Sequence, residues 1–220
     1  MTPVLELKNI EKKFGDVIAL EGINLSVHKG EWISIMGPSG SGKTTLLNIL
    51  SLMDAPTSGE YLLGGVDAGF LDEAQKLVIR REKVGLIFQQ FHLIPYLSAL
   101  ENVMLAQYYH SSVDEEDAKA ALAKVGLAHR LTHRPSELSG GEQQRLCIAR
   151  SLINDPEILL ADEPTGNLDE QNEKVILDLF CRLREEGKTI ILITHNPELG
   201  RYADRIINLR HGKMEEASHA

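Results

Sequence analysis

Short runs of apolar residues alternate with helical patterns along most of the chain. The runs predict buried strands at residues 32–36, 84–88, 158–161, 189–194 and 205–209, and we expect the last of these to be the final strand. Helical periods cover residues 43–51 and 169–185. The apolar face of the second helix is expected to contain Val175, Ile176, Leu179, Phe180 and Leu183. Strands that alternate with helices predict an α/β fold with a mostly parallel sheet.

Two segments depart from this alternation. Near the start, residues 5–7, 18–20 and 25–27 predict short strands of an antiparallel region. Strand-like runs are missing between residues 89 and 150. Helices are expected there over residues 98–106, 114–125 and 141–153, with Ser98 and Asp114 as N-caps. We therefore expect one domain over residues 1–220, with a core of 1–88 and 151–220, an antiparallel β subdomain, and a helical subdomain inserted at 89–150.

Composition restricts the partners and the compartment. The formal net charge of −9 opposes a phosphate backbone, so we expect no nucleic-acid partner. No apolar run approaches the roughly 18–20 residues of a membrane span, and the first residues lack a signal-peptide pattern. These features predict a cytoplasmic protein that reaches a membrane only through a partner. Cys147 and Cys181 form no CxxC pair, and small buried apolar positions are the interpretation we favour for both.

A glycine-rich segment lies between the strand at 32–36 and the helix at 43–51. Its sequence is Gly37-Pro38-Ser39-Gly40-Ser41-Gly42-Lys43-Thr44, which matches G-x-x-x-x-G-K-[ST] in the strand-to-helix context that this motif requires. Its backbone N–H groups, together with Thr45 in the first helical turn, are expected to bind phosphate oxygens. Lys43 is expected to reach the β- and γ-phosphates and Thr44 to bind Mg²⁺. A turn with a chance lysine is the alternative, which the flanking strand and helix disfavour.

Polar side chains stand at the ends of three other predicted strands. The strand at 158–161 leads into Asp162 and Glu163. Asp162 is expected to bind the Mg²⁺, and Glu163 is expected to orient and deprotonate the attacking water. His195 follows the strand at 189–194 and can contact a γ-phosphate and the catalytic base together. Gln89 closes the strand at 84–88 and could reach the metal or the water. Each of these also fits an ordinary solvated strand end, and the nearby P-loop is what favours catalysis.

The segment Leu138-Ser139-Gly140-Gly141-Glu142-Gln143-Gln144-Arg145 resembles the signature motif of ABC ATPases. With the P-loop and the polar strand ends in the same order, nearly the whole chain is similar to an ABC nucleotide-binding domain. The resemblance implies an ATPase that uses ATP and Mg²⁺. It also implies a head-to-tail dimer over two nucleotides, in which Ser139, Gly140, Gly141 and Glu142 contact the ATP bound by the other protomer. The start of this helix is itself an anion site.

The same resemblance assigns two further positions. Phe14 is similar to the aromatic residue that stacks on adenine, although the family more often has tyrosine there. A core aromatic at a strand end is the competing interpretation. Asn167-Leu168-Asp169 resembles the loop that touches the opposite protomer, and Asp169 is also a candidate cap of the helix at 169–185.

Residues 88–103 and 161–169 are similar to the MacB/LolD-like group, whose members act in macrolide export or lipoprotein release with a separate permease. This likeness implies a homodimer or paired ATPase subunit, an integral membrane permease as partner, and a peripheral position on the cytoplasmic side of the inner membrane. One apolar cluster is expected either to line a groove for a short permease helix or to pack inside the helical subdomain. Its members are Phe91, Leu93, Ile94, Tyr96 and Leu97.

Two other functions compete with transport. A soluble non-transport ABC ATPase, such as an iron–sulfur assembly component, would share the motifs above. A small-molecule P-loop kinase would have no use for residues 138–145, and ATP turnover without an acceptor would exclude it.

Overall fold

The computed structural model describes residues 2–69, 71–110 and 112–217, and a six-stranded sheet forms its centre. In spatial order the strands are β10 (Lys213–Ala217), β9 (Arg205–Arg210), β3 (Trp32–Met36), β8 (Thr189–Thr194), β7 (Ile158–Asp162) and β6 (Val84–Ile87). All neighbouring strands are parallel except β9 and β10. The predicted mostly parallel sheet is therefore confirmed.

The prediction that the strand at 205–209 is the last one is wrong. β10 follows β9 through a turn at His211 and Gly212, whose φ angles are 48° and 74°. Lys213 and Glu215 lie on β10, which among the described strands pairs only with β9 and forms an edge of the sheet. An edge strand with charged side chains has no apolar run, so the pattern gave no signal for it.

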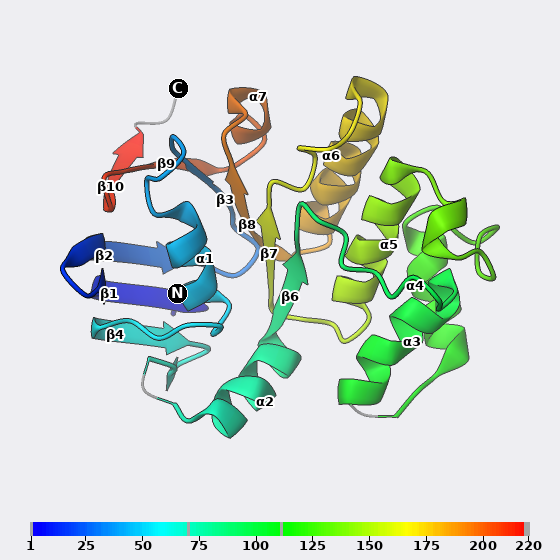
Figure 1. The fold of residues 1–220 in the computed structure, drawn as a ribbon, viewed down its shortest axis with the longest axis horizontal. Helices are drawn as coiled ribbons and strands as arrows, with labels where there is room; N and C mark the ends of the chain where they lie inside the picture. Colours follow the sequence, from blue (N-terminus) through cyan, green and yellow to red (C-terminus); the bar gives the residue numbers. More distant parts are fainter. Residues whose placement is uncertain (1, 70, 111, 218–220) are drawn as a thin grey trace.

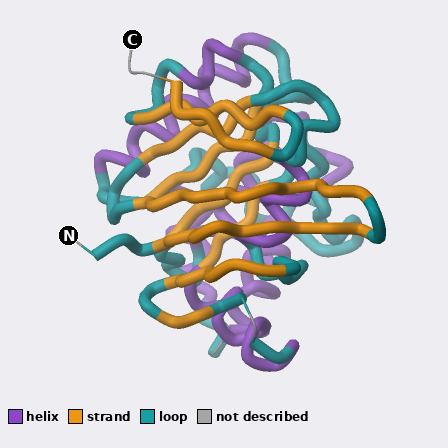
Figure 2. Tube along the Cα trace, turned by 90° about the vertical axis from the view of Figure 1, so that its left-hand side faces the viewer, coloured by secondary structure: helices purple, strands orange, loops and turns teal. Residues whose placement is uncertain are grey.

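A second, antiparallel sheet covers one side of the molecule. Its order is β2 (Val17–Val27), β1 (Leu5–Phe14), β4 (Ser58–Leu63) and β5 (Val66–Asp67). Figure 2 shows its strands side by side, with helices behind them. The antiparallel pairing was predicted, but residues 18–20 and 25–27 belong to one strand, and β4 and β5 were not predicted. Shifts in the β1–β2 register interrupt the alternation of side chains and hide the continuity of β2.

The helices are α1 (Lys43–Leu50), α2 (Glu73–Lys83), α3 (Ala99–His110), α4 (Glu115–Lys124), α5 (Gly140–Leu152), α6 (Glu170–Glu185) and α7 (Pro197–Gly200), with a 3₁₀ turn at Pro135–Glu137. The predicted caps are confirmed: Ser98 Oγ accepts from Glu101 N–H at 3.2 Å, and Asp114 accepts from two N–H groups of α4. α2 was missed because it buries only Lys76 and leaves Leu77 and Val78 exposed, so it has no apolar stripe. On α6, Val175 is 37% exposed and does not belong to the buried face.

The two faces of the central sheet contribute to separate hydrophobic clusters. Along β7, Ile158 and Leu160 enter one cluster, and Leu159 and Ala161 enter the other. The first cluster joins the sheet to α1 and to the antiparallel sheet, and the second joins it to α3–α6. In Figure 1, α1 lies between the two sheets, whereas α3, α4 and α5 group together beyond β6.

Tyr61 connects the last turn of α1 to the antiparallel sheet. It is fully buried, and its hydroxyl donates to Leu50 O at 2.7 Å. Burial raises the pKa of this hydroxyl, so it remains a donor. Tyr61→Phe should lower the free energy of unfolding by about 1–2 kcal/mol, because the buried Leu50 carbonyl loses its donor. Chemical denaturation measures the change. Tyr108→Phe, at a 69% exposed position, is the control, and an equal loss in both variants would contradict the account.

Candidate functional site

Three adjacent strands end at the same edge of the central sheet. β8 lies between β3 and β7, with Met36 opposite Thr194 and Asp162 opposite Ile193. Because the strands are parallel, the segments that follow them emerge together. These segments are the glycine-rich loop after β3, Asp162 and Glu163 at the end of β7, and His195 after β8.

The loop after β3 approaches other backbone so closely that two of its glycines have no substitute. A Cβ on Gly37 would lie 2.2 Å from Leu209 O, and a Cβ on Gly42 would lie 2.8 Å from Ala19 O. Gly42 also has a φ of 105° and is the N-cap of α1, with no side-chain cap and no acidic residue in the first turn. The N–H groups that open α1 therefore remain available for an anion, and their predicted contact with phosphate oxygens stays a prediction.

Part of this loop and the first turn of α1 border a cavity of ≈ 510 Å³. Lys43 Nζ donates to Gly37 O at 2.7 Å and to Pro38 O at 3.0 Å, so its ammonium lies against the loop. Of the predicted loop residues, the cavity lining contains Ser39, Gly40, Gly42, Lys43, Thr44 and Thr45. Ser41 is buried beneath it, and its carbonyl accepts from Gly212 N–H at 3.0 Å.

The opposite wall of the cavity was not predicted. It consists of Val17, Ile18 and Ala19 from β2, and His211 and Gly212 from the β9–β10 turn. The His211-Gly212 pair after a strand is a turn signal that could have been noticed. No pattern in the chain shows that this turn folds back onto the P-loop.

Among the described residues, the Asp162 carboxylate lies near Lys43 without a direct partner. Burial is the main cause that raises the pKa of Asp162, and the neighbouring Glu163 carboxylate raises it further. The Lys43 ammonium acts in the opposite direction and lowers it. Within the described residues the Asp162 side chain has no hydrogen bond or ion pair. A half-buried carboxylate without a partner is costly unless a cation joins it. Oxygen donors of this kind, with the Thr44 hydroxyl on the cavity lining, are the ligands that Mg²⁺ prefers. The residues present therefore fit a magnesium ion.

Glu163 is held in a strained conformation. Its φ of 44° lies in the left-handed region, which non-glycine residues rarely adopt and which is often associated with functional sites. Thr194 Oγ1 lies 3.0 Å from Glu163 Oε2, and His195 Nδ1 lies 2.7 Å from Oε1. The His195 side chain is otherwise largely exposed, at 71%. The structure thus brings His195 to Glu163, as the sequence suggested, and adds Thr194.

Gln89 lies just beyond β6 and is linked to the loop after Glu163. Its Nε2 lies 3.4 Å from Asn167 Oδ1, and Asn167 Nδ2 donates to the Gln89 carbonyl at 3.1 Å. Among the described residues the Gln89 side-chain oxygen, which is the atom a metal would use, has no partner. Asp169, two residues after Asn167, accepts from Asn172 N–H at 2.8 Å, so its predicted capping role is confirmed.

Residues 139–142 open α5 away from the cavity described above. Ser139 is the N-cap; its Oγ accepts from Glu142 N–H, and its own N–H donates to Glu142 Oε2. This backbone bond, with the nearby Arg130, lowers the pKa of Glu142 to about 2. A Cβ on Gly141 would lie 2.0 Å from Asn172 Oδ1, which fixes α5 against the start of α6. Ser139 and Gly140 are exposed, and none of residues 138–145 lines the P-loop cavity.

Phe14 lies at the end of the β1–β2 hairpin, opposite Val17. It is 53% exposed, so the interpretation as a core aromatic is wrong. The Lys12 ammonium lies 5.0 Å from its ring centroid. Phe14 is outside the cavity lining but next to the β2 wall, and its predicted contact with adenine stays a prediction.

The comparison with family models agrees with this geometry. Residues 20–166 match the model described as ABC transporter. The chain belongs to the ABC transporter family of ATPases. It is 48% identical over 220 residues to an uncharacterized ABC transporter ATP-binding protein of Methanocaldococcus jannaschii, a match that covers 97% of this chain and 98% of that one. It is 47% identical over 217 residues to the macrolide export ATP-binding/permease protein MacB of Bdellovibrio bacteriovorus, covering 96% of this chain.

This ABC ATPase spans about a third of the MacB relative, 33% of its length. Among solved structures, it is similar to the ATP-binding cassette MJ0796 in a dimeric post-hydrolysis state bound to ADP and Pi. The TM-score is 0.87 at 41% identity, and the match covers 98% of this chain and 100% of that one. In the part of the chain that the structure describes, none of the helices has the length and apolarity needed to cross a membrane.

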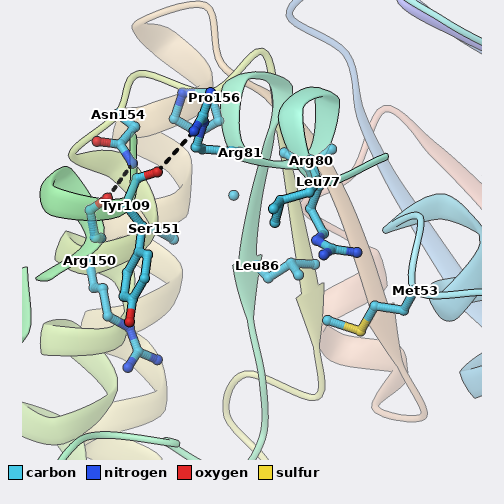
Figure 3. A pocket seen from close by; sticks show the side chains of 13 residues that line it. Met53, Leu77, Arg80, Arg81, Leu86, Tyr109, Arg150, Ser151, Asn154 and Pro156 are labelled. Atoms are coloured by element: carbon cyan, nitrogen blue, oxygen red, sulfur yellow. Dashed lines mark hydrogen bonds between the residues drawn. The ribbon is translucent and has the colours of Figure 1, made fainter. Parts of the chain in front are cut away.

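A second hollow of the ABC ATPase, ≈ 360 Å³ in volume, lies between α2, β6 and the ends of α3 and α5. Met53, Leu77, Leu86 and Tyr109 form its apolar walls, and Arg80, Arg81 and Arg150 stand around it (Figure 3). The apolar cluster after Gln89 contributes no lining residue. Leu93 packs against the core, whereas Tyr96 is 72% exposed, so the cluster divides between the two expectations stated for it.

Lys43→Ala should weaken ATP binding by about tenfold or more, because the phosphates lose a charge-assisted contact. Titration with a fluorescent ATP analogue measures the dissociation constant. Lys83→Ala is the matched control, since Lys83 pairs with Glu157 at 2.7 Å outside the cavity. Equal affinities for all three proteins would show that Lys43 does not contact the nucleotide.

Proposed function

We propose that this ABC ATPase works as a head-to-tail dimer that closes over two Mg-ATP and drives a separate permease of the MacB/LolD type. The observation that carries the proposal is the presence of two candidate anion sites on one chain that do not share a cavity. One is the P-loop with the start of α1. The other is the start of α5, where Ser139 and Gly140 are exposed.

A second copy of the chain can bring these two sites together. The start of α5 is rigidly built by the Ser139–Glu142 capping box and by the contact between Gly141 and Asn172. Ser139 and Gly140 are exposed at this helix start, and they suit the γ-phosphate of an ATP held by another protomer. The dimeric form of the similar cassette MJ0796, with ADP and Pi, supports this arrangement.

Each residue of the site then has a role in hydrolysis. The P-loop N–H groups and Lys43 bind the phosphates, and Phe14 supplies a stacking surface for the base. Glu163 accepts the proton of the attacking water, and His195 holds Glu163 and the γ-phosphate in place. Mg²⁺, when bound by Thr44, Asp162 and Gln89, would neutralise charge on the phosphates. Catalysis is mainly positioning and charge stabilisation, since phosphoryl transfer needs little covalent assistance.

The hollow between α2 and α5 is the surface we assign to the permease. Its exposed apolar side chains, Leu77 at 53% and Met53 at 50%, suit the apolar face of a short helix, and its arginines suit carboxylates on that helix. The likeness to a third of MacB, a protein named as both ATP-binding and permease, supports a permease partner. Such a partner would hold the chain at the cytoplasmic side of the inner membrane.

The hollow lies at the boundary between the core and the helical subdomain. The hollow is bordered by α2 and β6 on one side and by α3 and α5 on the other. We propose that residues 89–150 move relative to the core, 1–88 and 151–220, and that the Gln89–Asn167 contact relays nucleotide state to this movement.

Glu163→Gln should retain Mg-ATP binding and lower turnover by about 100-fold or more, because the amide cannot accept the water proton. Because it does not hydrolyse the bound ATP, the Glu163→Gln variant should also become dimeric when Mg-ATP is added. Light scattering after gel filtration measures this change in mass. Glu157→Gln is the control, because Glu157 directly precedes β7 and lies at the opposite end of this strand from Glu163. Turnover close to that of the unmodified chain would mean that another group activates the water.

Leu77→Glu should reduce co-purification of an integral membrane protein with the tagged chain by about tenfold, because a charge in the apolar wall opposes docking. ATP turnover of the isolated chain should stay within about twofold. Val66→Glu, at a 43% exposed position on β5, is the matched control. Tyr96→Glu tests the apolar cluster after Gln89 as the alternative docking surface. Loss of the membrane partner with Tyr96→Glu but not Leu77→Glu would place docking after Gln89.

A further inference from the structure

The end of β8 attaches to Glu163 through three consecutive residues. Ile193 O accepts from Glu163 N–H at 2.8 Å, Thr194 Oγ1 contacts Glu163 Oε2 at 3.0 Å, and His195 Nδ1 contacts Oε1 at 2.7 Å. The first contact fixes the backbone and the other two fix the carboxylate. His195 is exposed, whereas the Thr194 side chain is fully buried. Thr194 therefore cannot touch the nucleotide without rearrangement, so its hydroxyl can act on the reaction only through Glu163.

The direction of the Thr194 hydrogen bond follows from its second partner. Asn196 N–H donates to Thr194 Oγ1 at 3.0 Å. A hydroxyl has one proton to donate, and since Asn196 fills an acceptor position, that proton is directed at Glu163 Oε2. Asn196 is fixed in turn, because its side chain accepts from Glu198 N–H and donates to Glu173 at 3.1 Å. The hydroxyl is thus oriented by a continuous set of bonds.

We propose that Thr194 is a positioning residue for hydrolysis: its hydroxyl holds Oε2 of the strained Glu163, so that Oε1 stays aimed at the attacking water and at His195. The proposal rests on the role of Glu163 proposed above. A carboxylate on a residue with φ of 44° has no regular secondary structure to orient it, so side-chain contacts must do so. Loss of one of two contacts lets the carboxylate rotate, and misplacement of a catalytic group by about 1 Å costs up to about 100-fold in rate.

Thr194→Val removes the hydroxyl and keeps the side-chain shape. We expect kcat for ATP to fall by about tenfold, with KM within about twofold, because the defect concerns the reacting water and not nucleotide binding. Thr194→Ser should recover most of the rate. Thr189→Val is the matched control: it lies at the other end of β8, is equally buried, and its hydroxyl accepts from Gly30 N–H at 3.0 Å.

A double-mutant cycle separates positioning from a general structural effect. In the Glu163→Gln background, Thr194→Val should change the residual rate by less than about twofold, since the carboxylate it acts through is gone. An equal fall in both backgrounds, unchanged kcat in Thr194→Val, or failure of Thr194→Ser to recover activity would each overturn the proposal. If Glu163→Gln itself keeps full turnover, the role of Glu163 is wrong instead. Thr194→Ala replaces the valine variant if the latter does not fold.

Discussion

The parallel register of β3, β8 and β7 is the constraint on which the rest of the site depends. Met36 lies opposite Thr194, and Asp162 opposite Ile193, so the P-loop, the acidic pair and His195 leave the sheet at one edge. A slip of one residue would turn every side chain of a strand to the other face and separate Glu163 from Thr194. The alternation of side chains between two hydrophobic clusters fixes this register, because each face of β7 packs against a different layer.

Close backbone approaches then attach the P-loop to distant segments. Gly37 meets Leu209 O, Gly42 meets Ala19 O, and Gly212 N–H donates to Ser41 O. These contacts tie the loop to β9, to β2 and to the β9–β10 turn, so the anion site is preformed and not assembled by the ligand. A preformed cradle loses little conformational entropy on binding, which is where such a site gains affinity.

Motif spacing predicted the chemistry of the site better than its surroundings. The glycine-rich loop, the acidic pair and His195 each follow a clear strand pattern, and the parallel sheet brings them to one edge. The cavity wall of Val17, Ile18 and His211 could not be predicted, because it depends on how the antiparallel sheet and the edge strand β10 fold over the P-loop. Thr194 was likewise hidden: a threonine at a strand end is common, and only the tertiary contact with Glu163 distinguishes it. β5, α2 and α7 were missed since short or exposed elements have no strong periodicity.

In the dimer that we propose, the P-loop of one chain and the start of α5 of another complete each ATP site. Mixing two inactive variants, Lys43→Ala and Ser139→Arg, tests this arrangement most directly. In a head-to-tail heterodimer one site combines both defects, but the other joins an intact P-loop to an intact α5 start. We expect ATP turnover of the mixture to rise well above that of either variant alone. A mixture that stays as inactive as its two components would contradict this arrangement, because each chain would then have to supply both parts of its own site.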